Sequence, residues 1–152
     1  MSISLIVTTY NRPEALILVL KSIECQILPP SEVIIADDGS DEQTKDLISE
    51  FNSQSNLEII HSFQEDLGFR AAEARNKAIS ISKSDYIILV DGDMILHPKF
   101  VADHLKNAKF GFFIQGSRSL LTEKKTKDVI IRHQLVFNFL SSGLNNRFNS
   151  IH

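Results

Sequence analysis

The chain has 152 residues, of which 43% are hydrophobic and 23% are charged, and these proportions are ordinary for one soluble globular domain. A single cysteine, Cys25, excludes an intramolecular disulfide framework and a zinc site built from cysteines. Residues 1–116 hold 10 Lys/Arg against 17 Asp/Glu, whereas residues 117–152 hold 6 against 2, so an acidic body (−7) precedes a basic end (+4). A nucleic-acid-binding protein would show a basic footprint overall, and this class is therefore disfavoured.

The sequence does not predict a transmembrane segment or a signal peptide. No apolar run approaches the length of a membrane span, and Met1 leads directly into the apolar run ISLIV without the basic segment that opens a signal peptide. We therefore expect a cytoplasmic protein without a transmembrane segment. The basic end could contact an anionic glycan or the inner face of a membrane, although a solvated helix surface is the simpler interpretation.

Strands and helices alternate along the first part of the chain. Apolar, β-branched runs favour buried strands at 2–9, 32–36 and 57–62. The segments between them predict helices at about 13–25, where Pro13 suits the first turn, and from Asp41 to about 51.

The alternation continues in the second part of the chain. The expected elements are a small-residue helix at 71–80, a strand at 85–90, a helix from His97 to about 109, a strand at 111–116 (GFFIQG), a charged loop at 120–128, a helix at 129–140 and a polar tail from Ser141. Short connections between alternating strands and helices imply βαβ units. The sequence therefore predicts an α/β fold with a mainly parallel sheet flanked by helices.

The strand at 85–90 ends in two carboxylates, Asp91 and Asp93, separated by Gly92. Two carboxylates at the carboxyl end of a buried strand raise the free energy of the folded state unless a cation lies beside them. Gly92 lets a backbone or a ligand approach closely. A divalent cation that carries an anionic ligand is the simplest explanation, at the edge of the sheet where open α/β proteins bind ligands.

Two other strand ends are also polar. The first strand ends in Thr8-Thr9-Tyr10-Asn11, and the second ends in Asp37-Asp38-Gly39. Either segment alone would be an ordinary turn or helix cap. In a parallel sheet all three polar ends lie at one edge, so they can converge on a single pocket.

The segments ISLIVTTYNRPEAL, EVIIADDGSDEQT, DLGFRAAEARNKAI and DYIILVDGDM occur in this order within residues 1–117. Together they resemble the nucleotide-sugar-binding portion of family 2 glycosyltransferases, which have the Rossmann-like GT-A fold. The resemblance implies a domain that takes a sugar from a nucleotide diphosphate, usually UDP. It also implies that residues 1–117 form the donor-binding core and that residues 118–152 begin an incomplete acceptor-side region.

The resemblance assigns four residues to the nucleoside end of the donor. Tyr10 should lie against the uracil ring, with Thr8 lining the same site. Asp38 should accept a hydrogen bond from uracil N3–H, which suits a carboxylate because it only accepts. Gly68 should permit the close approach of its loop. Many relatives carry proline where this chain has Thr8, and we expect only a small change in the turn.

The resemblance assigns the remaining residues to the diphosphate end. Arg75 should reach the ribose or the phosphates, and Arg12 should help to neutralise phosphate charge. Asp91 and Gly92 should line the ribose and metal side of the site. Asp93, with Asp91, should ligate Mn²⁺ or Mg²⁺, because oxygen ligands suit such cations.

The implied reaction transfers the sugar, with inversion, to a hydroxyl of a glycan or glycolipid, as in polysaccharide biosynthesis. Relatives take the catalytic base from an acidic motif well downstream of the metal motif, and they are longer. After Gly116 this chain has only Glu123 and Asp128, both in a lysine-rich stretch. We therefore expect a C-terminally truncated domain whose catalytic base lies outside the chain.

Three alternatives are compatible with parts of the pattern. A haloacid-dehalogenase-type phosphatase also places Asp-x-Asp after a buried strand, but normally on the first strand of the sheet. A nucleotidyltransferase or a dinucleotide oxidoreductase would need a glycine-rich loop after the first strand, whereas the first glycine here is Gly39. A fragment that binds UDP and metal without transferring sugar is the third alternative. The sequence leaves the sugar, the acceptor and the oligomeric state open.

Overall fold

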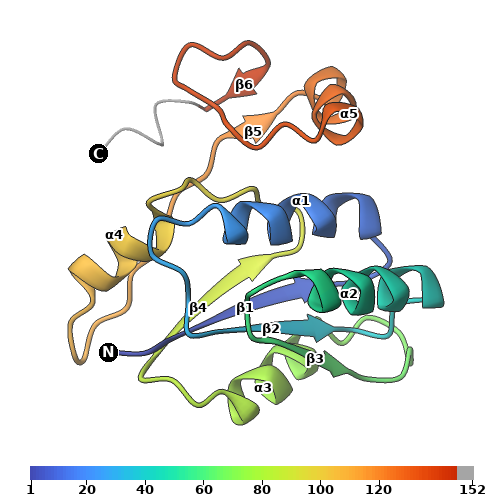
Figure 1. The fold of residues 1–152 in the computed structure, drawn as a ribbon, viewed down its shortest axis with the longest axis vertical. Helices are drawn as coiled ribbons and strands as arrows, with labels where there is room; N and C mark the ends of the chain where they lie inside the picture. The colour runs from blue at the N-terminus through green and yellow to red at the C-terminus, as the bar shows by residue number, and fades with distance from the viewer. Residues whose placement is uncertain (147–152) are drawn as a thin grey trace.

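The computed structural model describes residues 1–146, which form a four-stranded sheet, helices on both of its faces and a small C-terminal cap (Figure 1). The strands of the sheet are β1 (Ile3–Thr9), β2 (Glu32–Asp37), β3 (Ile59–Phe63) and β4 (Tyr86–Asp91). The helices outside the cap are α1 (Pro13–Glu24), α2 (Glu42–Gln54), α3 (Ala71–Ile81) and α4 (Phe100–Asn107). The C-terminal cap comprises β5 (Leu120–Leu121), α5 (Glu123–Arg132) and β6 (Leu144–Asn145).

The sheet has the order β3-β2-β1-β4, and every neighbouring pair is parallel. This confirms the predicted α/β fold with a mainly parallel sheet. β1 lies between β2 and β4, and its central residues are buried because helices cover both faces. The order reverses at β1, because β2 and β3 lie on one side of it and β4 on the other.

The alternation of side chains along the strands separates two apolar cores. On one face, β-strand residues such as Leu5 and Val7 pack with α1, α2 and the start of α4. On the other face, Ile6 and Ile34 pack against Ala74 and Ala78 of α3. The alanines are fully buried, so α3 lies close to the sheet, as its small residues predict.

Two buried polar residues of α1 and its C-terminal turn hold the segment that follows β4. Ser22 Oγ accepts a hydrogen bond from the backbone N–H of Leu96 (3.0 Å). The side-chain amide of Gln26 donates to the carbonyl of His97 (2.9 Å) and accepts from the N–H of Val101 (3.0 Å). These bonds satisfy backbone groups that would otherwise be buried without partners. They also fix the chain just beyond the Asp91-Gly92-Asp93 turn.

The predicted strand at 111–116 is wrong, since no strand is found there within the described chain. Gly111 has a φ of +79°, and the N–H of Phe112 donates to the carbonyl of Lys109, so the chain turns where extension was expected. The Phe110 and Phe113 side chains are almost fully exposed. An apolar run becomes a strand only when a neighbouring strand takes its backbone hydrogen bonds, and this segment lies beside none among the described residues.

The predictions for the C-terminal cap are also wrong. The stretch expected to be a charged loop, 120–128, contains β5 and the first part of α5, and the helix expected at 129–140 ends at Arg132. Thr122 starts α5 by accepting a hydrogen bond from the N–H of Lys125, and ion pairs of Glu123 with Lys127 and of Asp128 with Arg132 run along the helix.

Two further predictions concern the polar tail and the absence of a transmembrane segment. The expected polar tail includes β6, and its last part, residues 147–152, lies outside the described residues. Within residues 1–146, no helix is long and apolar enough to cross a membrane.

A buried acid joins the amino ends of the strands. The Glu32 side chain accepts hydrogen bonds from Ser4 Oγ, from the backbone N–H of Lys83 (2.8 Å) and from Ser84 Oγ (3.4 Å). Burial raises the pKa of Glu32, but the hydrogen bonds to its charged form outweigh this effect and the net pKa is lowered.

Stability should therefore depend on the ionisation of Glu32. A lowered pKa in the folded state contributes stability above the unfolded pKa of about 4.3, and this contribution is lost as the pH falls through the folded pKa. We expect Glu32→Gln to lower the free energy of unfolding by about 1–3 kcal/mol at pH 7. The variant should also lose less stability than the unsubstituted chain between pH 5 and pH 3, measured by urea unfolding. The exposed Glu42, replaced by Gln, is the control, and equal pH slopes for all three proteins would refute the role of Glu32.

Two glycines at the carboxyl edge of the sheet have positive φ but different surroundings. Gly39, after β2, has a φ of +95°, and a Cβ there would lie 2.5 Å from the Cα of Asp66. Gly68, between β3 and α3, has a φ of +89° and open space around it. Gly39 therefore permits a close backbone contact, whereas Gly68 only relieves backbone strain.

These surroundings predict different costs for alanine at the two positions. Gly68→Ala should lower the free energy of unfolding by about 1 kcal/mol, the cost of a left-handed residue with a Cβ. Gly39→Ala should cost about 3 kcal/mol or more, because the backbone of Asp66 must also move away from Gly39. Thermal and urea unfolding of the two variants measure the difference. Equal costs would mean that the contact with Asp66 does not constrain Gly39.

Candidate functional site

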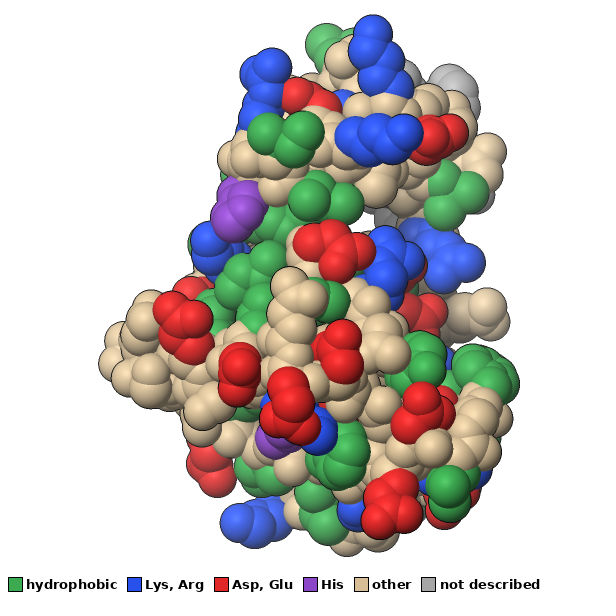
Figure 2. All heavy atoms as spheres, turned by 90° about the vertical axis from the view of Figure 1, so that its right-hand side faces the viewer, with side chains coloured by type: hydrophobic (Ala, Val, Ile, Leu, Met, Phe, Trp, Pro, Cys, Tyr) green, Lys and Arg blue, Asp and Glu red, His purple; other side chains and the backbone are tan. Residues whose placement is uncertain are grey.

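The carboxyl ends of β1, β2 and β4 meet at one edge of the sheet, as the sequence predicts. The register pairs Thr8 with Asp91 of β4 and Thr9 with Asp37 of β2. Figure 2 looks onto this edge and shows Asp and Glu side chains over the sheet domain, with Lys and Arg gathered on the C-terminal cap above it. The uneven charge along the chain is thus also uneven in space.

Arg75 links two of the strand ends. Its Nε donates to Thr8 Oγ1 (2.9 Å), and one of its terminal nitrogens donates to Asp91 Oδ1 (3.0 Å). Side chains alternate between the two faces along a strand, and Thr8 and Asp91 both point to the face of the sheet that α3 covers. This alternation explains why they meet Arg75. Thr8, which differs from the proline of many relatives, therefore does more than modify the turn: its hydroxyl orients Arg75. Arg118 approaches Asp91 Oδ2 from the segment after α4, at 3.8 Å.

The turn after β4 separates the two carboxylates. The N–H of Gly92 donates to the carbonyl of Thr8 (2.7 Å), and a Cβ on Gly92 would lie 2.7 Å from the same oxygen. Only glycine therefore fits this close approach to β1. Asp93, at the tip of the turn, is exposed and has no hydrogen bond or ion pair to another described residue.

The donor set at this turn suits a metal that takes only part of its coordination from the protein. No group of three or more His, Cys, Asp or Glu side chains among residues 1–146 could hold a metal. Asp93 offers a free carboxylate, and Asp91 offers oxygens that it shares with arginine. Mg²⁺ is commonly held by one or two carboxylates, with waters and substrate phosphates completing its shell. The residues present therefore fit Mg²⁺ or Mn²⁺ bound together with a diphosphate.

Asp37 and Asp38 stabilise the loops that surround the site. Asp37 is fully buried and accepts hydrogen bonds from the N–H of Ser40 (2.8 Å) and from His61 Nε2 (2.8 Å). Burial raises the pKa of Asp37, but the bonds to His61 and Ser40 outweigh it and lower the pKa overall. Asp38 is 3% exposed, and its two oxygens accept from Gln64 Nε2 (2.6 Å) and from the N–H of Arg70 (2.8 Å).

Asp38 thus anchors the loop between β3 and α3, a role that the sequence does not reveal. Its contact with a nucleotide base stays a prediction. A carboxylate can accept about four hydrogen bonds. A base that reaches Asp38 must share an oxygen with Gln64 or Arg70, or must displace one of these two donors.

The turn after β1 is tied to both neighbouring loops. Tyr10 is half-exposed, and its hydroxyl donates to Asp66 Oδ2 (3.0 Å). Asn11 adopts a left-handed conformation (φ +47°), and its side-chain oxygen accepts from the N–H of Asp41 (2.7 Å). Arg12 pairs with Glu14 at the start of α1 (2.9 Å), not with the acids of the strand ends.

The structure therefore divides the predicted site residues into three sets. Thr8, Arg75 and Asp91 are in direct contact, with Gly92 and Asp93 on the adjoining turn. Tyr10, Asp38 and Gly68 are connected through the loop between β3 and α3, where the N–H of Gly68 donates to Asp66 Oδ1 (3.2 Å). Arg12 belongs to neither group.

The sequence reasoning missed Asp66 and Gln64. Both lie in the segment QEDLGFR, where a polar residue two positions before a glycine often hydrogen-bonds a turn. This pattern could have singled out Asp66.

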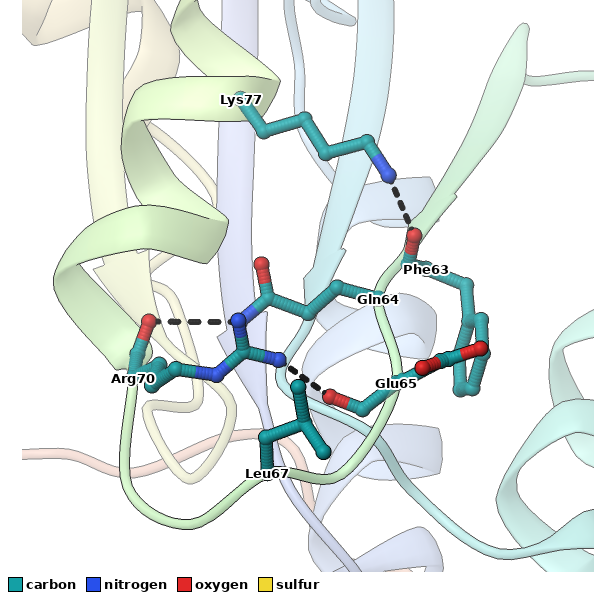
Figure 3. Close-up of a pocket in the computed structure, with 6 residues that line it drawn as sticks. All are labelled: Phe63, Gln64, Glu65, Leu67, Arg70 and Lys77. Carbon is teal, nitrogen blue, oxygen red and sulfur yellow. Dashed lines mark hydrogen bonds between the residues drawn. The ribbon is translucent and has the colours of Figure 1, made fainter.

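A cavity of about 460 Å³ borders the same loop (Figure 3), and neither Asp91 nor Asp93 is among its lining residues. Its lining consists of Phe63, Gln64, Glu65, Leu67, Arg70 and Lys77. Lys77 donates to the carbonyl of Phe63, and Arg70 donates to the carbonyl of Glu65. The two cations are thus engaged in bracing the loop.

Comparison with known proteins is consistent with this geometry. The model of the family described as "Glycosyl transferase family 2" matches residues 4–147. A hyaluronan synthase from Pasteurella multocida is 38% identical over 104 residues, which are 68% of this chain and 10% of that protein. A chondroitin synthase from Escherichia coli is 31% identical over 105 residues, 68% of this chain and 15% of that protein. The chain thus spans a small fraction of these relatives.

Solved structures share the fold. Staphylococcus aureus TarS 1-349, solved in complex with UDP-GlcNAc, superposes with a TM-score of 0.58 at 26% identity, covering 70% of this chain and 30% of that one. The mannosyltransferase PcManGT from Pyrobaculum calidifontis, solved with GDP-Man and Mn²⁺, gives 0.58 at 22% identity, covering 68% and 31%.

The match of the family model spans nearly the whole chain, and the parallel sheet flanked by helices agrees with the fold of the solved structures. The haloacid-dehalogenase alternative is therefore wrong. The chain is a glycosyltransferase domain of the GT-A type and belongs to glycosyltransferase family 2.

Proposed function

We propose that this domain binds a UDP-sugar together with Mn²⁺ or Mg²⁺ and that it serves the transfer of the sugar to a glycan or glycolipid hydroxyl. The observation that carries the proposal is the hydrogen-bonded group of Thr8, Arg75 and Asp91 beside the free carboxylate of Asp93. The complex of TarS with UDP-GlcNAc and the polymer synthases among the relatives support a UDP-sugar donor and a glycan acceptor. With a glycolipid acceptor, the reaction would take place at the inner face of a membrane.

The nucleoside end of the donor would bind between the turn after β1 and the loop between β3 and α3. Tyr10 offers a half-exposed aromatic ring for a base to lie against. Thr8 would line the same site, and Asp38 would accept the uracil N3–H through an oxygen that it shares with Gln64 or Arg70. Gly68 keeps the loop free of a side chain at a position with a positive φ.

The diphosphate end would bind at the turn after β4. Arg75 and Arg118 place positive charge beside Asp91, and Gly92 lets the turn pack directly against the end of β1. Asp93 and Asp91 would hold the divalent metal, which when bound stabilises negative charge on the departing diphosphate. Residues 1–117 would thus be the donor-binding core, and residues 118–152 would begin the acceptor side.

In the proposed transfer, a base takes the proton of the acceptor hydroxyl and the hydroxyl oxygen bonds to the anomeric carbon. The bond to UDP breaks on the opposite face, so UDP leaves with the electron pair and the configuration inverts. The acids after Gly116 in the described chain, Glu123 and Asp128, form ion pairs within the C-terminal cap. This observation favours a second candidate, in which the chain alone binds the donor without transferring the sugar.

The metal site predicts how UDP binding responds to one substitution. UDP should bind in the presence of MnCl₂, and Asp93→Ala should weaken that binding by at least about tenfold, as loss of a metal-binding group does. Removal of the metal should have a similar effect, and the variant should no longer respond to metal. Isothermal titration calorimetry measures all four combinations, with Asp46→Ala as an exposed acidic control on α2. UDP binding that is indifferent to both metal and substitution would refute the metal site.

A transfer assay separates the two candidate functions. If the chain only binds the donor, it should bind a UDP-sugar with metal but release no UDP from it, with or without oligosaccharide acceptors. Release of UDP that depends on metal and on Asp93, detected by a coupled assay, would show that the chain carries its own catalytic base.

A further inference from the structure

Asp66 is the point at which three separate parts of the proposed donor site meet. Its Oδ2 accepts from the Tyr10 hydroxyl (3.0 Å), and its Oδ1 accepts from the N–H of Gly68 (3.2 Å). Its backbone packs so closely on Gly39 that no Cβ would fit there. One residue therefore connects the turn after β1, the turn after β2 and the loop that precedes α3.

The two carboxylate oxygens of Asp66 have different partners. The bond to Gly68 N–H is local and closes the bend of the loop itself. The bond to Tyr10 joins residues 56 positions apart and links β1 to the loop after β3, passing over the end of β2 where Asp38 lies. Because Tyr10 is half-exposed, apolar packing alone does not hold its ring in one orientation.

We propose that Asp66 is a positioning residue for the nucleotide base, which holds the Tyr10 ring as one wall of the base site. The proposal rests on the proposed binding of UDP and adds a residue that does not itself touch the base. A ring that is already oriented loses less rotamer freedom when a base lies against it, so the tether should increase affinity. Tyr10 also carries a raised pKa, because it donates to the charged Asp66 and lies near Asp38.

The first measurement tests the tether without any ligand. Tyr10 and Tyr86 are the two tyrosines of the chain, so Tyr86→Phe leaves Tyr10 as the single phenol. Its ionisation, followed by ultraviolet absorbance, should occur above the ordinary value of about 10. In the same background, Asp66→Ala and Asp66→Asn should both lower the pKa, since each removes the negative charge. An unchanged titration would mean that Asp66 does not hold Tyr10.

The second measurement tests the effect on binding, by calorimetry with UDP and MnCl₂. Asp66→Ala and Tyr10→Phe should each weaken UDP binding about three- to tenfold, the effect of losing about one hydrogen bond. The double variant should bind no more weakly than the weaker single variant, because both substitutions break the same contact. Asp66→Asn should retain UDP affinity within about twofold, because the phenol oxygen can accept from the amide.

Two controls separate this role from general damage to the loop. Glu65→Ala removes the same charge from the neighbouring residue, whose side chain has no hydrogen bond to another described residue, and should leave UDP affinity unchanged. Asp66→Ala should bind inorganic pyrophosphate with MnCl₂ as well as the unsubstituted chain does, because pyrophosphate has no base. Equal weakening of UDP and pyrophosphate would indicate a distorted site and overturn the proposal.

The outcome also distinguishes this proposal from the proposed function. UDP binding by the unsubstituted chain that is insensitive to Asp66→Ala would refute the positioning role and leave the proposed function intact. A chain that binds pyrophosphate with metal but prefers UDP no more than other nucleoside diphosphates would refute the base site as a whole.

Discussion

The parallel pairing of β1 with both β2 and β4 is the constraint on which the rest of the structure depends. Its register ends the three strands together, so that polar residues far apart in sequence reach one edge of the sheet. Strand alternation then decides which of them can meet. Thr8 and Asp91 point to the α3 side and find Arg75, whereas Asp37 points to the opposite side and stabilises the turn before α2. A shift of one residue would exchange these two sets.

Negative charge at this edge is held in two different ways. Asp37 and Asp38 are buried and accept hydrogen bonds from His61 and from backbone and side-chain N–H groups. Their main role is therefore to stabilise the loops around the site. Asp91 is half-exposed between two arginines, and Asp93 faces solvent. The charge still available to a ligand is therefore concentrated at the tip of a single turn, next to arginines that can meet an anion.

The sequence was sufficient for the sheet because its strands are mostly apolar, β-branched segments that end in polar turns, although β3 and Leu89 of β4 are less buried than expected. The same reasoning failed at 111–116, where GFFIQG has strand composition but no neighbouring strand among the described residues. It also failed at α5, whose stability comes from the Thr122 cap and from ion pairs rather than from an apolar face. The candidate site residues were named from the resemblance to family 2 glycosyltransferases, and their roles stay predictions. Their partners could not be named in this way, because contacts such as Tyr10 with Asp66 depend on the path of a loop.

The hydrogen bonds of Ser22 and Gln26 have a consequence for the local unfolding of this domain. They attach the segment after the Asp91-Gly92-Asp93 turn to α1, while the turn itself is attached to β1 through Gly92. The turn therefore has no hinge of its own, and local unfolding that frees it must also detach part of α1 from Leu96 and Val101. The backbone amides of Gly92 and Met94, which donate to the carbonyls of Thr8 and Asp91, should thus share the protection against hydrogen exchange of the interior of the sheet, which is unusual for a surface turn.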